Sequence, residues 1–406
     1  MKQDYFKIYD NDIFELKSRV VSVNVSDKTL LVVLDKSPFR PSSGGQPSDN
    51  GFLENENFKG FVEEVVDKGD YLVHKVRLER GSLKQGDYVI ARINRERRQK
   101  LKHMHSSEHI FAKALKKLDD NIVLDKISLS EGESSIFVKA ETLNWDLLFK
   151  AEEIVNKVIS ENRYFRIHYA RKEEIDDWID KGLRIKKDKI KDDFVRIVEV
   201  ENFDISACTG THVKNSSEIN SFIVTGFKNL GKNTFQIRFI AGNTRELLFD
   251  YSREFRKLRT LFGEQDIFNT AKKQITDKEL LKNKYYYYFS KFLLSMTPDL
   301  INNIRFYSFV FENEDQKVLI RNSSKLCSDR TVVCFLNKQG NYYNLILMAS
   351  KDLTVNLKEL FQREVLTVCN GKAGGNPHYI IGRLECENPT LILDKVKSFV
   401  KSKFGN

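Results

Sequence analysis

Cysteine is scarce in this chain of 406 residues, which has five cysteines and no CxxC pair. So few thiols cannot form the disulfide scaffold of a small secreted protein, and they favour a reducing cytoplasm. Long apolar runs are also missing, since no stretch approaches the ~18–20 residues that a membrane span needs. The first residues, MKQDYFKIYDNDIF, carry acidic side chains where a signal peptide has an apolar core. The sequence therefore predicts a cytoplasmic protein with no membrane span.

The remaining composition is that of a folded, basic protein. Hydrophobic residues make up 41% of the chain, with 29 Phe and 15 Tyr, which argues against disorder. At roughly 100–200 residues per domain, the length predicts two to four domains. The 67 Lys and Arg residues exceed the 57 Asp and Glu residues, giving a formal charge of +10. This surplus is a weak indication of a polyanionic partner such as nucleic acid.

Hydrophobic periodicity predicts an α+β protein with four regions. β-branched runs predict a small β-rich unit at the N-terminus, and a helical period begins at Asn94. A charged segment almost free of glycine predicts a helical linker or an antiparallel coiled coil. The last region has an α/β pattern, with a Gly-rich loop predicted over 370–382. The predicted boundaries are 1–92 for the β-rich unit, 93–243 for the α+β region, 244–292 for the linker and 293–406 for the C-terminal region.

Two short motifs place His and Cys residues at the same spacing. His105 and His109 stand four residues apart in a predicted helix, so their side chains leave the same face. Cys208 and His212 have the same offset in a loop that follows a predicted strand. Either pair alone is weak support for a metal site. Together they provide one thiolate and three imidazoles, a set of ligands suited to Zn²⁺.

The segment 37–51, SPFRPSSGGQPSDNG, holds three of the six prolines of the chain. So much Pro and Gly in one connection predicts a fixed and unusual backbone path, which is either functional or a rigid corner. Gly44 and Gly45 permit a close approach of the backbone to a ligand. Gln46 could donate a hydrogen bond to that ligand. The alternative is a Gly-rich hairpin that merely turns the chain.

Three motifs in this order resemble those of the free-standing alanyl-tRNA editing proteins of the long type. The same motifs mark the editing domain of alanyl-tRNA synthetase and of its threonyl relative. They stand here as SGGQPSDNG at 43–51, HSSEH at 105–109 and CTGTHV at 208–213. The resemblance implies a β-barrel, a zinc-binding editing domain, a helical linker and a C-terminal domain of the DHH-associated type.

The activity implied by the resemblance is the hydrolysis of wrongly attached serine, or glycine, from tRNA for alanine, with one Zn²⁺ per chain. The implied zinc ligands are His105, His109, Cys208 and His212. A catalytic zinc keeps one position open, whereas four protein ligands describe a closed site. We expect His212 to be the ligand that exchanges most readily. The linker and C-terminal domain are compatible with a homodimer.

Further site residues are expected from the same resemblance. Glu108 stands where the family has a neutral residue, and its carboxylate is expected either to act as a general base or to be an ordinary helix residue. Gln46 is expected to be catalytic or to bind the substrate. The other expected substrate-binding residues are Ser43, Gly44, Gly45, Ser106, Ser128 and Thr211. Basic candidates for tRNA contact are Arg95, Arg97, Arg98, Lys100 and Lys102, with a solvated helix face as the alternative.

Two other functions remain open at the level of sequence. One is a non-catalytic tRNA-binding relative whose zinc is structural. The other is a peptidase, since HSSEH also fits the H-x-x-E-H pattern of inverzincins. That pattern would make Glu108 the base and would leave Cys208 and His212 without a role.

Overall fold

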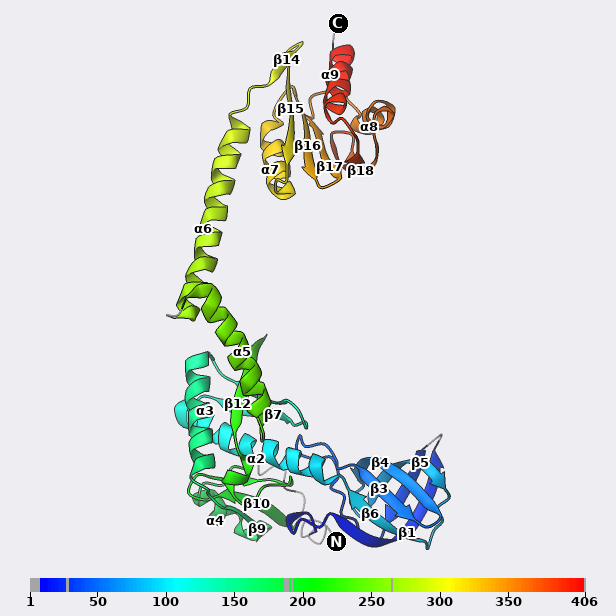
Figure 1. Ribbon diagram of the computed structural model, residues 1–406, viewed down its shortest axis with the longest axis vertical. Helices are drawn as coiled ribbons and strands as arrows, with labels where there is room; N and C mark the ends of the chain where they lie inside the picture. The colour runs from blue at the N-terminus through cyan, green and yellow to red at the C-terminus, as the bar shows by residue number, and fades with distance from the viewer. Residues whose placement is uncertain (1–7, 27–28, 186–189, 191–192, 264–265, 405–406) are drawn as a thin grey trace. The chain divides into compact units, whose positions relative to one another are not determined.

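The computed structural model describes residues 8–26, 29–185, 190, 193–263 and 266–404 (Figure 1). The chain divides into two compact units, Met1–Glu254 and Phe255–Asn406. Among the described helices, none combines the length and the apolar character that crossing a bilayer requires.

The first unit begins with a closed antiparallel barrel of six strands in the order β1-β2-β5-β4-β3-β6. Alternate side chains such as Val32, Val62 and Val76 are fully buried inside it, which explains the β-branched runs in the sequence. The barrel confirms the N-terminal β-rich unit. Its strands are β1 (Glu15–Ser26), β2 (Thr29–Leu34), β3 (Gly51–Asn55), β4 (Phe58–Asp67), β5 (Leu72–Gly81) and β6 (Tyr88–Ile93).

The rest of the first unit is built around the long helix α2 (Arg95–Leu118). Asn94 caps this helix, because its side chain accepts a hydrogen bond from the N–H of Arg97 at 3.1 Å. The helix α3 (Trp145–Ser160) packs beside α2 and is capped by Asn144, whose side chain accepts a hydrogen bond from the N–H of Leu147 at 2.9 Å. Phe111 of α2 contacts Phe222 and Phe239 in the shared core.

Two sheets complete this unit. One has four strands in the order β12-β13-β8-β7, and the other has three in the order β11-β10-β9. Their members are β7 (Val123–Ser128), β8 (Ser134–Lys139), β12 (Phe222–Gly231) and β13 (Thr234–Ala241), and β9 (Phe165–Arg171), β10 (Phe194–Val200) and β11 (Asp204–Ala207). Shorter elements are η1 (Lys172–Glu174), α4 (Ile175–Asp180) and η3 (Ser216–Ile219).

The predicted helical segment forms α5 (Arg245–Phe262) and α6 (Ile267–Leu294). No described side chain of α5 is buried. Tyr251, Phe255 and Leu258 stand at helical spacing and form an apolar stripe on α5, and they are 47%, 53% and 41% exposed. This stripe is therefore left open to solvent by the described chain.

The second unit contains a six-stranded sheet in the order β14-β15-β16-β17-β19-β18, in which only β15 and β16 pair in parallel. The prediction of a Gly-rich loop over 370–382 is wrong. This segment forms the edge strand β18, a short turn and the beginning of β19. The elements are β14 (Asp299–Ile301), β15 (Ile304–Glu312), α7 (Gln316–Leu326), β16 (Thr331–Gln339), β17 (Tyr342–Ala349), α8 (Leu357–Arg363), η4 (Val365–Thr367), β18 (Asn370–Asn376), β19 (Tyr379–Glu385) and α9 (Thr390–Phe404).

Candidate metal centre

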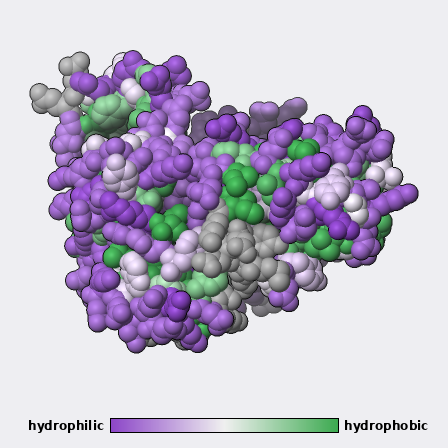
Figure 2. Space-filling view, turned by 90° about the horizontal axis from the view of Figure 1, so that it is seen from below, coloured by the Kyte–Doolittle hydropathy of each residue, from purple (hydrophilic) through white to green (hydrophobic). Residues whose placement is uncertain are grey.

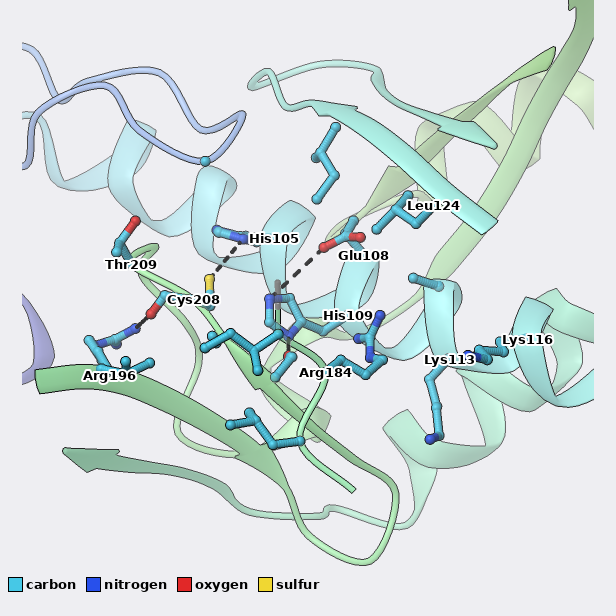
Figure 3. A pocket seen from close by; sticks show the side chains of 18 of the residues that line it. His105, Glu108, His109, Lys113, Lys116, Leu124, Arg184, Arg196, Cys208 and Thr209 are labelled. Carbon is cyan, nitrogen blue, oxygen red and sulfur yellow. Dashed lines mark hydrogen bonds and ion pairs between the residues drawn. The ribbon is translucent and has the colours of Figure 1, made fainter. Parts of the chain in front are cut away.

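The helix α2 and the loop after β11 bring the four predicted metal ligands together. The ligating atoms of His105, His109, Cys208 and His212 all lie within 4.8 Å of one another. The sulfur of Cys208 is 3.3 Å from Nε2 of His105 and 3.3 Å from Nε2 of His212. Figure 3 shows His105, His109 and Cys208 turned toward one another beside the cavity. Two pairs that are far apart in the sequence thus form one cluster.

Each of the three histidines has a polar partner at its Nδ1 atom. For His105 the partner is the Gln46 side-chain oxygen at 2.9 Å. For His109 the partner is the Ser206 hydroxyl at 2.8 Å. For His212 the partner is the Ser106 hydroxyl at 3.3 Å. Such partners fix the ring orientation of metal-binding histidines. The Nε2 atoms of His105 and His212 are left to face the Cys208 sulfur, as a shared metal requires.

The burial of the cluster favours the neutral form of the three imidazoles. Burial lowers the pKa of His109 to about 4 and lowers the pKa values of His105 and His212 well below the ordinary value. Burial raises the pKa of the Cys208 thiol, while nearby Arg196 and the N–H of Gly210 act in the opposite direction. Neutral imidazoles offer lone pairs to a metal, and a metal would favour the thiolate. This donor set fits one Zn²⁺.

A second layer of polar residues supports His109. The hydroxyl of Ser206 donates to Asp204 at 3.2 Å and can therefore accept from Nδ1–H of His109. The guanidinium of Arg184 holds the same aspartate through two bonds of 2.8 and 2.6 Å. None of these three residues was predicted from the sequence. The alternation in the segment DISAC could have revealed two of them, because Asp204, Ser206 and Cys208 follow the period of a strand.

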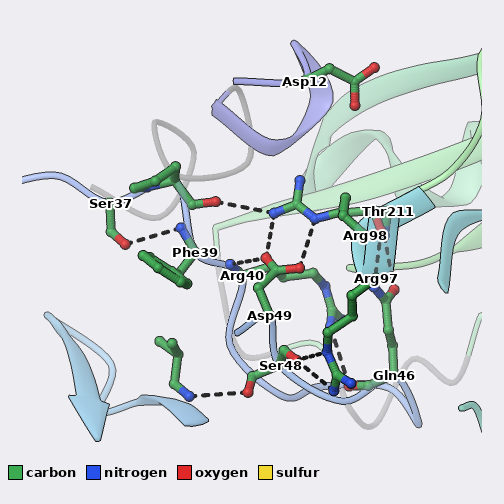
Figure 4. Close-up of polar contacts among 12 residues, drawn as sticks. Asp12, Ser37, Phe39, Arg40, Gln46, Ser48, Asp49, Arg97, Arg98 and Thr211 are labelled. Atoms are coloured by element: carbon green, nitrogen blue, oxygen red, sulfur yellow. Dashed lines mark hydrogen bonds and ion pairs between the residues drawn. The ribbon is translucent and has the colours of Figure 1, made fainter. Parts of the chain in front are cut away.

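The loop of the 43–51 motif packs directly on the Cys208 loop (Figure 4). Gln46 is 2% exposed, and its amide bonds to both the N–H and the hydroxyl of Thr211, at 3.1 and 2.9 Å. The buried guanidinium of Arg40 donates to the carbonyls of Thr209, Ser43 and Gln46 at 3.2, 2.9 and 3.3 Å. The barrel loop is thus part of the wall behind the metal ligands.

A cavity of about 1060 Å³ opens beside the cluster. At the metal end it is lined by Ser43, Gly44 and Thr209 together with three of the ligands. Glu108 also lines it, with a carboxylate oxygen 4.0 Å from Nε2 of His109 (Figure 3). Burial raises the pKa of Glu108 to about 8. The remaining wall is largely apolar, with Lys113 and Lys116 among its members.

Other predicted substrate-binding residues lie elsewhere. Ser106 is fully buried and bonds to His212 and to the N–H of Val213. Gly45 packs against β7, where a Cβ atom would lie 2.6 Å from the carbonyl oxygen of Ile127. Ser128 is exposed and is not among the described residues that line the cavity. Of the predicted pocket residues, Ser43 and Gly44 line the cavity itself.

The predicted basic stripe is largely paired. Arg98 is fully buried in an ion pair with Asp49, and Lys102 is 3% exposed and paired with Asp12. Neither side chain offers surface to a phosphate, which corrects the expectation for these two. The other three reach the surface: Arg95 lies over Phe14, Arg97 bonds to Ser48 and Glu131, and Lys100 pairs with Glu96.

Comparison with known families points to proteins that act on tRNA. The family described as "tRNA synthetases class II (A)" matches residues 5–97, the barrel and the start of α2. The family described as "Threonyl and Alanyl tRNA synthetase second additional domain" matches residues 195–239, which include the Cys208 loop.

Two kinds of curated protein are similar to this chain. The alanine–tRNA ligase of Wigglesworthia glossinidia brevipalpis is 25% identical over 91% of this chain and 43% of the ligase. That of Rubrobacter xylanophilus is 31% identical over 58% of this chain and 26% of the ligase. The chain therefore spans less than half of these ligases. The alanyl-tRNA editing protein AlaX-L of Pyrococcus horikoshii is 26% identical over 97% of this chain and 99% of that protein.

Among solved structures, the crystal structure of the C-Ala domain from Aquifex aeolicus alanyl-tRNA synthetase matches 27% of this chain and 100% of its own, with 24% identity and a TM-score of 0.24. The two family matches and the similarity over nearly the whole chain agree with the three motifs. The chain resembles the alanyl-tRNA editing proteins of the long type along nearly its whole length.

Proposed function

We propose that this protein is a zinc-dependent hydrolase that removes serine, or glycine, from tRNA for alanine. The observation that carries the proposal is the convergence of His105, His109, Cys208 and His212 in one cluster, three members of which line a large cavity. The relative AlaX-L, named as an alanyl-tRNA editing protein, matches the chain along its length. A tRNA substrate accords with the basic composition and would place the reaction in the cytoplasm.

The reaction breaks the ester bond between the aminoacyl carbonyl and a ribose hydroxyl of the tRNA. Water adds to the carbonyl carbon, and free serine and tRNA with its hydroxyl restored are the products. A bound Zn²⁺ would polarise the carbonyl or lower the pKa of water. Glu108 and the hydroxyls of Ser43 and Thr209 face the same space, so we propose that they contact the aminoacyl group.

The open coordination position that a catalytic zinc requires is proposed to come from His212. Its Nδ1 partner, Ser106, lies at 3.3 Å, whereas the partners of His105 and His109 lie at 2.9 and 2.8 Å. The longer hydrogen bond holds the ring less firmly. Gln46 is proposed to act through His105 rather than on the substrate, because its amide is engaged on both sides.

Contacts with the tRNA are proposed for two sets of cations. Arg95, Arg97 and Lys100 lie at the start of α2, and Lys113 and Lys116 line the cavity farther along the helix. Phosphates bind Lys and Arg mainly by charge. The regions 1–92, 93–243, 244–292 and 293–406 are proposed as barrel, editing domain, helical linker and C-terminal domain, and the exposed stripe of the linker is compatible with a homodimer.

The test is the release of amino acid from tRNA for alanine charged with serine, glycine or alanine. We expect zinc-dependent hydrolysis of the seryl ester and a much slower reaction with the alanyl ester. His109→Ala should lose zinc and activity together, while Ser128→Ala, outside the cavity lining, serves as the matched control. Tight tRNA binding without hydrolysis by the zinc-loaded protein would instead support the non-catalytic relative.

The same experiment addresses a peptidase. A metallopeptidase with the H-x-x-E-H pattern would keep its metal and its activity in Cys208→Ala. We expect this variant to lose zinc affinity, because the sulfur lies 3.3 Å from the ligating atoms of two histidines. Full zinc occupancy in Cys208→Ala would contradict the proposed centre.

A further inference from the structure

Glu108 is a buried carboxylate that none of the described residues neutralises. It is 2% exposed, and no described residue donates a hydrogen bond to it. A carboxylate oxygen of Glu108 lies 4.0 Å from Nε2 of His109, a neutral ring that belongs to the metal cluster. The nearby guanidinium of Arg184 is held by two bonds to Asp204. Among the described side chains, none therefore forms a close ion pair with the Glu108 carboxylate.

A buried carboxylate of this kind can be stabilised in two ways. It takes up a proton, or a cation with hydrogen-bond donors binds it as the anion. Glu108 lines the cavity, and Figure 3 shows its side chain at the edge of that space, beside His109. A cationic group that enters the cavity beside the metal ligands can therefore bind Glu108 directly.

We infer that Glu108 binds the α-ammonium group of the aminoacyl ester and so selects substrates with a free amine. The inference rests on the proposed function. In an aminoacyl ester the α-nitrogen lies only two bonds from the carbonyl carbon that is attacked. A group that recognises the α-ammonium must therefore lie directly beside the metal ligands. Glu108 is the one carboxylate among the described cavity-lining residues that does so.

This assignment has a consequence for specificity. An ester whose α-nitrogen is acylated has lost its positive charge, and the carboxylate would stay buried without a counter-charge. Sites that leave a buried polar group unpaired reject the wrong substrate far more strongly than sites that merely lose apolar contact. The protein would then spare peptidyl-tRNA and N-blocked aminoacyl-tRNA while it hydrolyses free seryl esters.

The test compares kcat/KM for seryl-tRNA and N-acetylseryl-tRNA, both on tRNA for alanine, with the zinc-loaded full chain. The wild type should prefer the free amine by at least 100-fold. Glu108→Gln should reduce that preference to less than about tenfold, mainly by slowing hydrolysis of the free-amine substrate. Glu153→Gln, at an exposed position of α3, is the matched control, and the zinc content of each variant is measured so that loss of metal is recognised.

A second measurement needs no variant. The wild type is assayed on the ester of the 2-hydroxy acid, in which a hydroxyl replaces the α-ammonium, with spontaneous hydrolysis of each ester subtracted. We expect at least a 100-fold lower kcat/KM for this analogue. Equal rates would overturn the inference. An equal loss on both acyl substrates in Glu108→Gln would also overturn it and would indicate a base acting on water.

These outcomes separate the inference from the proposed function. If the wild type hydrolyses seryl-tRNA without discriminating between free and blocked amines, only the role of Glu108 is wrong. If it hydrolyses no ester of tRNA for alanine, the proposed function itself fails.

Discussion

Gln46 has a fixed amide orientation, and this orientation determines which nitrogen of His105 carries the proton. The backbone N–H of Thr211 can only donate, so the atom that faces it at 3.1 Å must be the side-chain oxygen. The same oxygen lies 2.9 Å from Nδ1 of His105 and can accept its proton. The Nε2 lone pair of His105 is then directed at the metal position. A residue of the barrel loop thereby sets the geometry of a ligand on α2.

Replacing Gln46 with alanine should therefore weaken zinc binding. Loss of a residue that orients a metal ligand typically costs 10–100-fold in affinity. The measurement is competition with a chromophoric chelator at fixed pH. Ser43→Ala is the matched control, because this residue lies in the same loop but bonds only to Thr209 through its side chain. Equal affinities for the two variants would show that Gln46 does not orient His105.

His74 is a buried histidine of the barrel, far from the metal ligands in sequence. Its ring contacts the hydroxyl of Ser37 at 2.7 Å and the carbonyl of Val32 at 3.0 Å. Burial lowers its pKa to about 4. Neither partner could be predicted from the sequence, because both contacts depend on how the barrel closes.

This shift predicts a pH-dependent stability. Since the folded-state pKa lies below the ordinary value of 6.5, the unfolded chain takes up the proton first. The contribution of neutral His74 is complete above about pH 6.5 and is lost as the pH falls toward 4. We expect the free energy of unfolding, measured with urea, to fall between pH 7 and pH 5. The fall should be larger by roughly 2 kcal/mol in the wild type than in His74→Gln. Parallel losses would mean that His74 titrates normally.

At the scale of elements, the metal site depends on the close packing of two loops against α2. Gly210 of the Cys208 loop faces both α2 and the barrel loop. A Cβ atom at this position would be 1.9 Å from Cε1 of His105 and 2.8 Å from Oε1 of Gln46. Both contacts are well below a van der Waals distance. The Cys208 loop can therefore reach the helix only because its third residue has no side chain.

Gly210→Ala should push the Cys208 loop away from α2 and abolish tight zinc binding. Gly132→Ala is the matched control, because a Cβ atom at this position would meet nothing within 4 Å and the backbone there is not left-handed. Zinc content after gel filtration is the readout. A Gly210→Ala protein with a full complement of zinc would show that the loop can shift at little cost.

The long helices and the clustering of the four His and Cys residues were predictable because their patterns are local. The helical period of α2, the cap at Asn94 and the two spaced pairs of ligands are all contained in short segments. Arg98 and Lys102 looked like a basic stripe because their partners, Asp49 and Asp12, lie 49 and 90 residues away. The contact of Gln46 with Thr211 was hidden for the same reason, since the two residues are 165 positions apart.

At the scale of the whole molecule, the charge of +10 is distributed over a largely hydrophilic surface. Figure 2 shows one face on which apolar residues form small groups between hydrophilic ones. Several of the cations that the sequence placed near the site are paired, so a smaller set is left for tRNA. The two cavity lysines, Lys113 and Lys116, belong to that set.

Binding of tRNA should accordingly weaken with salt, and the slope of log K against log salt should identify the lysines involved. Each lost phosphate contact lowers that slope by about 1. We expect Lys113→Gln/Lys116→Gln to lower the slope by about 1 to 2. The control is Lys228→Gln/Lys232→Gln, which removes the same charge from exposed positions of the β12–β13 hairpin. This variant should change the slope less. A slope unchanged by the first pair would remove the cavity lysines from the tRNA contact.

The separation of the metal ligands also affects how the protein is made. His105 and Cys208 are 103 residues apart, so a growing chain presents the two helix ligands long before the thiol exists. The barrel, which ends at Ile93, can close during this interval. A metal ion at the proposed centre would therefore find its full set of ligands only late in synthesis. Zinc-starved cells should accumulate chains whose barrel resists protease while the segment after it is cut.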